Sequence, residues 1–275
     1  MTVQAGLLPD GVRLHLHHGP IDLVIRADGP ARAAAYDAAR ACFDGLLDRL
    51  VTELPDLRRA DPPDLSGPVA RRMQAATAPF LPEFITPMAA VAGAVADEVL
   101  SAMARVSGLG AAWVNNGGDV AFHLPQGATL TAALAGGQAR LSHDQPWRGI
   151  ATSGRGGRSF SLGIADSVTV VARTAAAADA AATMIANHVD LPGHPAVQRA
   201  PARDLLPDSD LGERPVTTGL GPLSARDTAR ALDTGLAYAR SLVARGLIGA
   251  AHLILNGASR TVGGAPLLPT EAMDA

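Results

Sequence analysis

The segment SVTVVARTAAAADAAATMIANHV, residues 167–189, contains the two patterns on which the fold prediction depends. Its first seven residues are rich in valine and threonine, which is typical of a β-strand. The remainder begins at Thr174, a residue suited to capping a helix, and consists mostly of alanine, a strong helix former. We therefore predict a strand over 167–173 that leads into a largely buried helix.

The flanking sequence adds further elements of both kinds. Apolar residues at helical spacing predict helices over residues 33–54, 88–108 and 225–246. The last of these opens with Ser224 and Asp227, which resemble a capping box. Short runs bounded by turn residues predict strands over 111–115, 119–124, 129–134 and 250–257. Because strands often follow strands here, we predict an α+β fold with antiparallel sheets packed against alanine-rich helices.

The chain has 275 residues, enough for one large domain or two intimate lobes. We expect a single domain over 1–275, with lobes at 1–110 and 111–275 and the functional site at their junction. Residues 190–222 are rich in proline, arginine and aspartate and predict a long connection, either a linker or a segment that carries a site or an interface. Small alanine side chains on the helix faces would permit a homodimer.

Composition excludes several classes of function. The formal net charge is −3, and the chain lacks a basic cluster, so we do not expect a nucleic-acid partner. All 23 basic residues are arginine, which excludes chemistry that depends on lysine. The single cysteine, Cys42, excludes an internal disulfide. Without an uninterrupted apolar stretch of membrane-spanning length or a signal-like start, we expect a cytoplasmic protein and no membrane association.

The eight histidines show no spacing typical of metal ligands. His15, His17 and His18 are close in sequence, but their alternation and the following glycine favour an edge strand over a metal site. The remaining histidines fit strand, capping or surface positions.

The first candidate site is VNNGGDVAF, residues 114–122. One interpretation is a hairpin turn, which Asn-Gly sequences favour. The other is a close backbone approach to a ligand at Gly117 and Gly118, where the absence of side chains allows it. Asn115, Asn116 and Asp119 would then supply hydrogen bonds.

The second candidate is the glycine-rich loop IATSGRGGRSFSLG, residues 150–163. Its glycines would let backbone N–H groups converge on an anion, with hydrogen bonds from Thr152 and Ser153. Arg155 and Arg158 would clamp phosphate or carboxylate. The loop residues predicted to bind a nucleotide are Thr152, Ser153, Gly154, Arg155, Gly156, Gly157 and Arg158. The alternative is a flexible surface loop.

The third candidate is the pair Asp179 and Thr183, which lie on one helix face because they are four residues apart. Asp179 is the only charged residue between Thr174 and Asn187, in an otherwise apolar helix. A buried carboxylate requires a cation or strong donors, and carboxylate plus hydroxyl oxygens suit Mg²⁺. The alternative is a polar stripe that faces solvent.

Taken in order, the segments VNNGGDVAF, GIATSGRGGRSFSLGIADSVTVVA and AADAAATM resemble the ApbE-like superfamily. The resemblance covers about residues 19–262 and is closer to the branch called uncharacterised protein family (UPF) 0280. Characterised ApbE-like proteins are Mg²⁺-dependent FAD:protein FMN transferases, which cleave FAD and attach FMN to a threonine of a flavoprotein. The resemblance implies a metal site of Asp179, Thr183 and the backbone carbonyl of Ala89 or its neighbour. It also places Gly117, Gly118 and the Thr152–Gly154 segment beside the flavin nucleotide.

The sequence departs from that family at two places. The segment His-Ile-x-Asp-Pro-x-Thr-Gly of the transferases is absent, and the expected lysine-glycine pair is Ala92-Gly93. Asp119 and Asp166 are candidates for the missing base, and Arg155 and Arg158 for the missing positive charge. The function that the resemblance implies is FAD cleavage or FMN transfer, with a flavoprotein acceptor. The alternatives are an enzyme for a small carboxylate or phosphate metabolite and a non-catalytic flavin-binding accessory protein.

Overall fold

The computed structural model describes residues 2–134, 137–157, 159–263 and 267–269. The chain forms two compact units. Unit 1 comprises Met1–Leu130, Ser142–Ala151 and Arg173–Asp179, and unit 2 comprises Thr131–Leu141, Thr152–Ala172 and Ala180–Ala275. Strand β8 (Gly149–Ser153) and helix α6 (Ala175–His188) each contribute residues to both units. The division into lobes at residue 110 stays a prediction.

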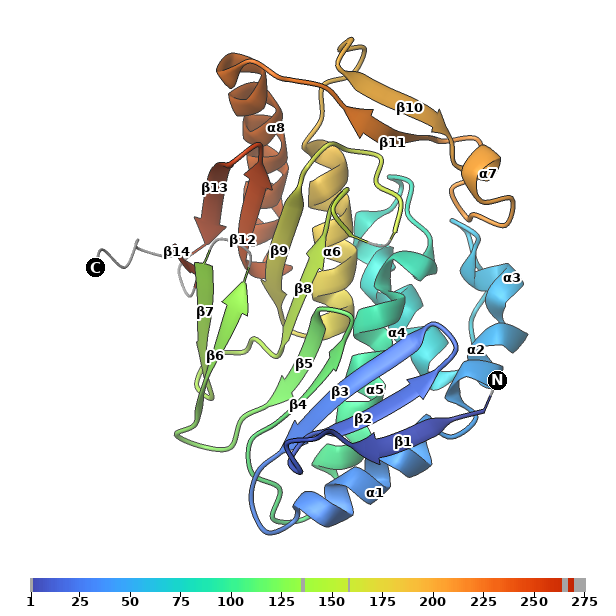
Figure 1. Cartoon of the computed structure of the whole chain (residues 1–275), viewed down its shortest axis with the longest axis vertical. Coiled ribbons are helices and arrows are strands. Elements are labelled where there is room, and N and C mark those ends of the chain that lie inside the picture. The colour runs from blue at the N-terminus through green and yellow to red at the C-terminus, as the bar shows by residue number, and fades with distance from the viewer. Residues whose placement is uncertain (1, 135–136, 158, 264–266, 270–275) are drawn as a thin grey trace. The chain divides into compact units, whose positions relative to one another are not determined.

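Unit 1 contains an antiparallel run of strands in the order β1-β2-β3-β4-β5, which follows their order in the chain (Figure 1). These strands are β1 (Gln4–Leu7), β2 (Leu14–His18), β3 (Ile21–Ala27), β4 (Ala112–Asn116) and β5 (Asp119–His123). Strand β5 also pairs with the start of β8, where Val120 lies opposite Ile150. Alternate residues of β3 are buried, because successive side chains point to opposite faces of a sheet.

Five helices of unit 1 lie between β3 and β4 in the chain. They are α1 (Arg32–Phe43), α2 (Leu46–Thr52), α3 (Leu54–Leu57), α4 (Pro68–Thr77) and α5 (Val91–Ala104), with 3₁₀ turns η1 (Ala78–Phe80) and η2 (Pro87–Ala90). The prediction of one helix over 33–54 was wrong. Gly45 has φ +65°, a left-handed conformation that ends α1 and lets α2 start in a new direction.

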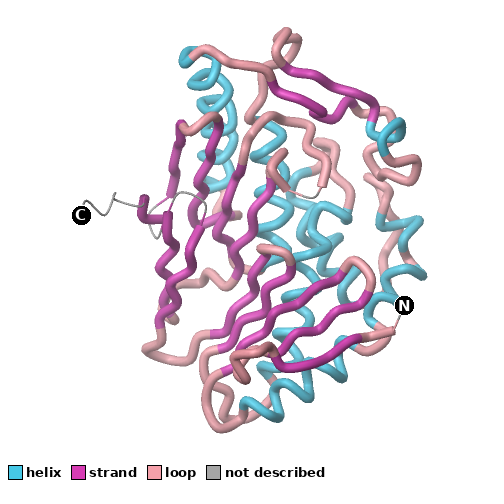
Figure 2. Tube along the Cα trace, viewed as in Figure 1, coloured by secondary structure: helices cyan, strands magenta, loops and turns pink. Residues whose placement is uncertain are grey.

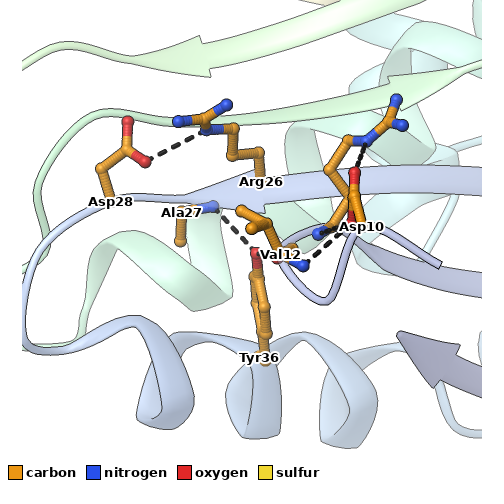
Figure 3. Close-up of polar contacts among 7 residues, drawn as sticks. Asp10, Val12, Arg26, Ala27, Asp28 and Tyr36 are labelled. Carbon is orange, nitrogen blue, oxygen red and sulfur yellow. Dashed lines mark hydrogen bonds and ion pairs between the residues drawn. The ribbon is translucent and has the colours of Figure 1, made fainter. Parts of the chain in front are cut away.

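Tyr36 ties α1 to the sheet of unit 1 (Figure 3). Its hydroxyl donates to the Val12 carbonyl at 2.6 Å and accepts from the Ala27 amide at 3.2 Å. The buried ring therefore joins the turn before β2 to the end of β3. Asp10 closes that turn by accepting from the amides of Val12 and Arg13.

Helix α5 is the most apolar helix segment of unit 1. Among the described residues, the stretch Pro87–Ala104 is the one helical segment long and apolar enough to cross a membrane by length and composition. More than half of it is buried inside the protein, and it contains Asp97 and Glu98. It packs against α1, α4, β4 and β5, as the central helix of a core does.

Unit 2 contains one run of four neighbouring strands and a separate three-stranded sheet. Strands β8, β9 (Ser167–Ala172), β12 (Ile248–Leu255) and β13 (Ala258–Gly263) are neighbours in that order, and β14 (Leu267–Pro269), β7 (Gly137–Ser142) and β6 (Thr129–Leu134) form a three-stranded sheet. Helix α8 (Ala225–Ala244) packs on β12 and β13 (Figure 2). The strand pairs with a defined register are antiparallel, so the predicted α+β class is confirmed.

The predicted helix starts of α6 and α8 are confirmed. Thr174 Oγ1 accepts from the Ala177 amide at 3.1 Å. Ser224 Oγ accepts from the Asp227 amide at 3.1 Å. Both side chains satisfy amides that have no partner within the helix itself.

Two other expectations need adjustment. The connection 190–222 is not without structure: β10 (Val197–Pro201) and β11 (Pro215–Leu220) form an antiparallel ribbon, with α7 (Ala202–Leu205) between them. The histidine-rich strand β2 is not an edge strand, because β1 pairs along its outer side. Among the residues described, no group of three or more His, Cys, Asp or Glu side chains is arranged to hold a metal ion.

Candidate functional site

The hairpin between β4 and β5 brings two polar side chains to the same end of the sheet in unit 1. Asn116 ends β4 and lies opposite Asp119, which begins β5. Gly117 and Gly118 form the turn with φ +66° and +115°, values that side-chain-bearing residues rarely adopt. The predicted turn is therefore present, and Asn115 closes it by accepting from the Gly118 amide at 2.8 Å.

Asn116 and Asp119 lie below the turn and are buried, with 5% and 7% of their surface exposed. The Asn116 amide nitrogen donates to the Ala92 carbonyl at 3.1 Å. Ala92 is the second residue of α5, so Asn116 fixes the hairpin against the first turn of that helix. Its predicted role beside a nucleotide stays a prediction.

Asp179 reaches the same helix turn from α6. Its Oδ2 accepts from the Gly93 amide at 3.1 Å, and the Ala92 amide also hydrogen-bonds to this carboxylate. The Asp119 carboxyl group lies within hydrogen-bonding distance of Asp179. The structure thus brings together Asp119 and Asp179, which are 60 residues apart in the sequence, at the first turn of α5.

The surroundings of this carboxyl pair disfavour the state in which both groups carry a negative charge. Burial, followed by the charge of Asp119, raises the pKa of Asp179 well above its ordinary value, and backbone hydrogen bonds only partly oppose this. Among the described residues, the groups that act most on this pKa include no basic side chain. Two carboxyl groups in such surroundings either share a proton or hold a cation.

A third carboxylate, Asp97, lies near the pair but does not belong to it. Asp97 accepts from the Ala175 and Ala176 amides at 3.0 and 2.9 Å, which are the first two amides of α6. A Cβ placed on Gly93 would lie 2.3 Å from the Ala175 carbonyl oxygen. The backbones of α5 and α6 therefore touch between Gly93 and Ala175, which requires glycine at position 93.

Two further residues were predicted to bind the metal. Thr183 lies on α6, four residues after Asp179, and its hydroxyl donates to Ser153 Oγ at 3.4 Å within unit 2. Ala89 lies in η2, directly before α5, where its amide donates to the Thr86 carbonyl. Their roles as metal ligands stay predictions.

The glycine-rich loop differs from the expected anion cradle. The amides of Arg155, Gly156 and Gly157 donate to the carbonyls of Ala165, Asp166 and Gly154 respectively. These three amides hold the loop together and do not converge on an empty centre. Gly154 has φ +135°, and a Cβ there would lie 2.8 Å from the Asp166 carbonyl oxygen, so this position requires glycine.

The charged side chains of the loop are also partnered. Arg155 donates to Asp166 Oδ1 at 2.5 Å, and Asp166 Oδ2 accepts from the Asn256 amide at 2.6 Å. Arg155 and Asp166, two of the three predicted catalytic residues, therefore balance each other's charge. Arg158, predicted to clamp phosphate, lies outside the described residues.

Thr152 and Ser153 are the last two residues of β8, and their hydroxyl groups have different partners. Thr152 Oγ1 hydrogen-bonds to Thr169 Oγ1 at 2.8 Å, across the neighbouring strand β9. Thr152 is exposed and Ser153 is half-buried, so both retain contact with solvent. Their predicted contact with a nucleotide is compatible with this exposure.

Sequence analysis missed Asp97. The signal that singled out Asp179, a carboxylate within an apolar helix, applies equally to Asp97 in VAGAVADEVLSAMA. The adjacent Glu98 hid it, because two consecutive acidic residues suggest a solvent-facing stretch. Only the structure shows that Asp97 is buried while Glu98 pairs with Arg72.

Comparison with known proteins identifies the family. The family model described as AbpE bacteria matches residues 5–261 of the chain. A UPF0280 protein of Methanopyrus kandleri is 36% identical over 182 residues, which cover 60% of this chain and 69% of that protein. The chain belongs to this family, among the UPF0280 proteins. The predicted family is therefore confirmed.

Other UPF0280 proteins match over different shares of their length. That of Methanosarcina acetivorans is 30% identical over 190 residues, covering 65% of this chain and 72% of the relative. That of Methanothrix thermoacetophila is 37% identical over 136 residues, covering 46% and 55%. Among solved structures, the apo form of the Pseudomonas stutzeri flavinyl transferase ApbE covers 95% of both chains, with 15% identity and a TM-score of 0.41. That score is too low for the likeness to support an inference about activity.

Proposed function

We propose that this UPF0280 protein is a divalent-cation-dependent enzyme that acts on a flavin nucleotide, by cleaving FAD or transferring FMN. The observation that carries the proposal is the pair of carboxyl groups of Asp119 and Asp179 at the first turn of α5. A protein keeps two mutually repelling carboxylates in a buried place when a cation or a reaction uses them.

The donor set fits Mg²⁺ better than a transition metal. Carboxylate oxygens are hard ligands, and the described residues place no cysteine or histidine ligand group there. With few protein ligands, Mg²⁺ retains waters and shares its remaining positions with phosphate oxygens. We propose Asp179 as the main protein ligand, with Thr183 and the Ala89 carbonyl as the further ligands that the family resemblance implies. A bound cation would neutralise charge that develops on a phosphate.

The chain's own residues would perform three tasks. The turn at Gly117–Gly118 leaves open space, since a Cβ on Gly118 would meet nothing within 4 Å, and a flavin nucleotide could approach the backbone there. Thr152 and Ser153 would donate hydrogen bonds to it. Asp119 is the residue that we propose as the proton acceptor, in place of the histidine that the transferases carry.

The proposed reaction replaces one oxygen bond to phosphorus with another. A hydroxyl oxygen, of a threonine or of water, forms a bond to the FMN phosphorus of FAD, and the bond from that phosphorus to the bridging oxygen breaks. AMP leaves with the bonding electron pair, and the hydroxyl proton passes to Asp119. The products are FMN, free or attached to the acceptor, and AMP.

Calorimetric titration with FAD, FMN and ADP, with and without Mg²⁺, tests the proposal. We expect FAD binding that depends on Mg²⁺ in the wild-type protein and in Asp37→Asn, a control that changes an exposed carboxylate on α1. Binding should be lost in Asp179→Asn. Incubation with FAD and Mg²⁺, followed by chromatography, should then show AMP. A folded wild-type protein that binds none of the three nucleotides would overturn the proposal.

A second candidate is an enzyme for a small anionic metabolite bound through Arg155. The partly exposed position of Arg155 favours it, because an anion could displace Asp166 from the guanidinium group. Loss of affinity for small phosphates in Arg155→Gln would support this candidate.

A further inference from the structure

Asp97 makes an unusual set of contacts for a buried charge. Only 8% of its surface is exposed, and its two oxygens accept from the first two amides of α6, on Ala175 and Ala176. The residue itself lies on α5, four residues after Gly93, and its bond to Ala175 links α5 to α6 across 78 residues of sequence.

A second contact between the same two helices runs in the opposite direction, from Asp179 of α6 to α5. Asp179 lies four residues after Ala175 on α6, and it accepts from Gly93 at the start of α5. Each helix therefore carries a carboxylate one turn beyond the contact of Gly93 with Ala175, and each carboxylate binds the first turn of the opposite helix. The first turns of α5 and α6 consequently share one rigid arrangement within unit 1.

Capping alone does not account for Asp97. Thr174 already caps α6 by accepting from the Ala177 amide, and solvent or a 3₁₀ turn commonly satisfies the remaining amides of a helix start. A buried carboxylate is a costly way to satisfy two amides unless its position serves another purpose. Asp179 begins the second turn of α6, directly after the turn whose amides Asp97 binds.

We infer that Asp97 is a positioning residue that sets where Asp179 lies relative to Asp119, and so sets the affinity of the Asp179 site for a divalent cation. This inference rests on the proposed function for its cation but concerns only residues of this chain. Partners that orient a metal ligand typically change affinity 10- to 100-fold when they are removed.

The test compares Asp97→Asn and Asp97→Ala with Glu53→Gln. Glu53 is a matched control, because its carboxylate also binds the start of a helix in unit 1, at Ser66 and Gly67 before α4. Two quantities are measured: the Mg²⁺ dissociation constant by calorimetry, and deuterium exchange of the peptide covering residues 88–96 without metal. The second measurement reports the Ala92 and Gly93 amides that Asp179 accepts from.

We expect Mg²⁺ affinity to fall about tenfold or more in Asp97→Asn, and exchange at Ala92 and Gly93 to accelerate. Glu53→Gln should change neither the Mg²⁺ affinity nor the exchange at Ala92 and Gly93, even if it lowers the melting temperature as much as Asp97→Asn does. If Asp97→Ala does not fold, Asp97→Asn still decides, because its amide oxygen keeps one of the two hydrogen bonds.

The outcomes distinguish the proposed cation site from the positioning role of Asp97. A wild-type protein that binds no Mg²⁺ overturns the proposed cation site, and the exchange experiment then decides on Asp97 alone. Unchanged exchange at residues 92–93 in a folded Asp97→Asn overturns the positioning role. Faster exchange with unchanged Mg²⁺ affinity also overturns it, because Asp97 would then stabilise the helices without affecting the site.

Discussion

Asp97 and Asp179 each bind the first backbone amides of the helix that carries the other. Asp97 extends from α5 to Ala175 and Ala176, and Asp179 extends from α6 to Gly93. The two interactions differ in their surroundings, because only Asp179 lies beside a second carboxyl group, that of Asp119. The same type of contact therefore joins two helices at one end and lies beside a second carboxyl group at the other.

Asp179→Asn should make the metal-free protein more stable. The raised pKa of Asp179 means that its charged form is unfavourable at neutral pH, because of burial and the neighbouring carboxylate of Asp119. An asparagine oxygen can still accept from Gly93 without carrying charge. We expect about 1 kcal/mol of added stability, or a melting temperature higher by about 2–4 °C, as when other strained functional sites are neutralised.

Differential scanning calorimetry with and without Mg²⁺ measures this effect. The wild-type protein should gain stability from Mg²⁺, whereas Asp179→Asn should not respond. Asp37→Asn serves as the control and should behave like the wild type. A loss of stability in metal-free Asp179→Asn would show that the carboxylate pair is not under electrostatic strain.

Gly93→Ala should destabilise the protein, although alanine is normally the better helix residue by about 1 kcal/mol. The new Cβ would lie 2.3 Å from the Ala175 carbonyl oxygen, so the helices would have to separate. We expect a net loss of about 3 kcal/mol, the upper range for overpacked sites. Urea unfolding measures it, with Gly6→Ala as control because a Cβ at Gly6 meets nothing within 4 Å. Equal stability of the two variants would contradict the close contact.

The contribution of Glu53 to stability should depend on pH. The hydrogen bond from the Ser66 hydroxyl, aided by that from the Gly67 amide, lowers the pKa of Glu53 below its ordinary 4.5, against the opposing effect of burial. A lowered pKa in the folded state means that the unfolded state binds the proton more tightly. The stabilisation is therefore complete above pH 4.5 and is lost as the pH falls through the lower, folded value.

Unfolding of the wild type and of Glu53→Gln in urea should follow this sign. At pH 6 we expect the wild type to be more stable by about 0.5–1 kcal/mol, the usual worth of a hydrogen bond at a helix start. As the pH falls below 4.5 the difference should shrink toward zero. A difference that grows as the pH falls would contradict the assigned hydrogen bonds.

Arg155→Gln tests whether the glycine-rich loop binds an anion. Because the Arg155–Asp166 pair is about one-third exposed, its loss should cost less than 1 kcal/mol. If the loop binds an anion, affinity for ADP and for small phosphates should fall about tenfold, since a charge-assisted hydrogen bond is lost. Calorimetry measures it, with the exposed arginine of Arg226→Gln as control. Unchanged affinity would remove Arg155 from either function.

Much of the fold could be predicted because its local signals agree. Thr174 and Ser224 cap helices as expected, and Gly117 and Gly118 form the expected turn. The predicted helix over 33–54 failed at Gly45, because helical spacing continues on both sides of a residue whose conformation breaks the helix. Spacing alone cannot distinguish one helix from two that follow each other with the same apolar pattern.

The site was predictable only in part. The composition of α6 pointed to Asp179, but which group would lie beside it depends on the register of β4 and β5 and on the approach of α5, neither of which the sequence displays. The partners of the loop were not predictable either: its amides at 155–157 and the Arg155 side chain bind groups within the chain, at Ala165, Asp166 and Gly154. A glycine-rich composition is equally suited to binding an anion and to folding back on itself.

The first turn of α6 is enclosed by glycine on two sides. Gly93 approaches Ala175 from α5, and a Cβ on Gly149 of β8 would lie 2.1 Å from the Thr174 carbonyl carbon. Both neighbours are backbone, so no rotamer change could make room for a larger residue. A side chain at either glycine would therefore have to displace the backbone at the start of α6, and a library that randomises both positions would consist mostly of destabilised proteins.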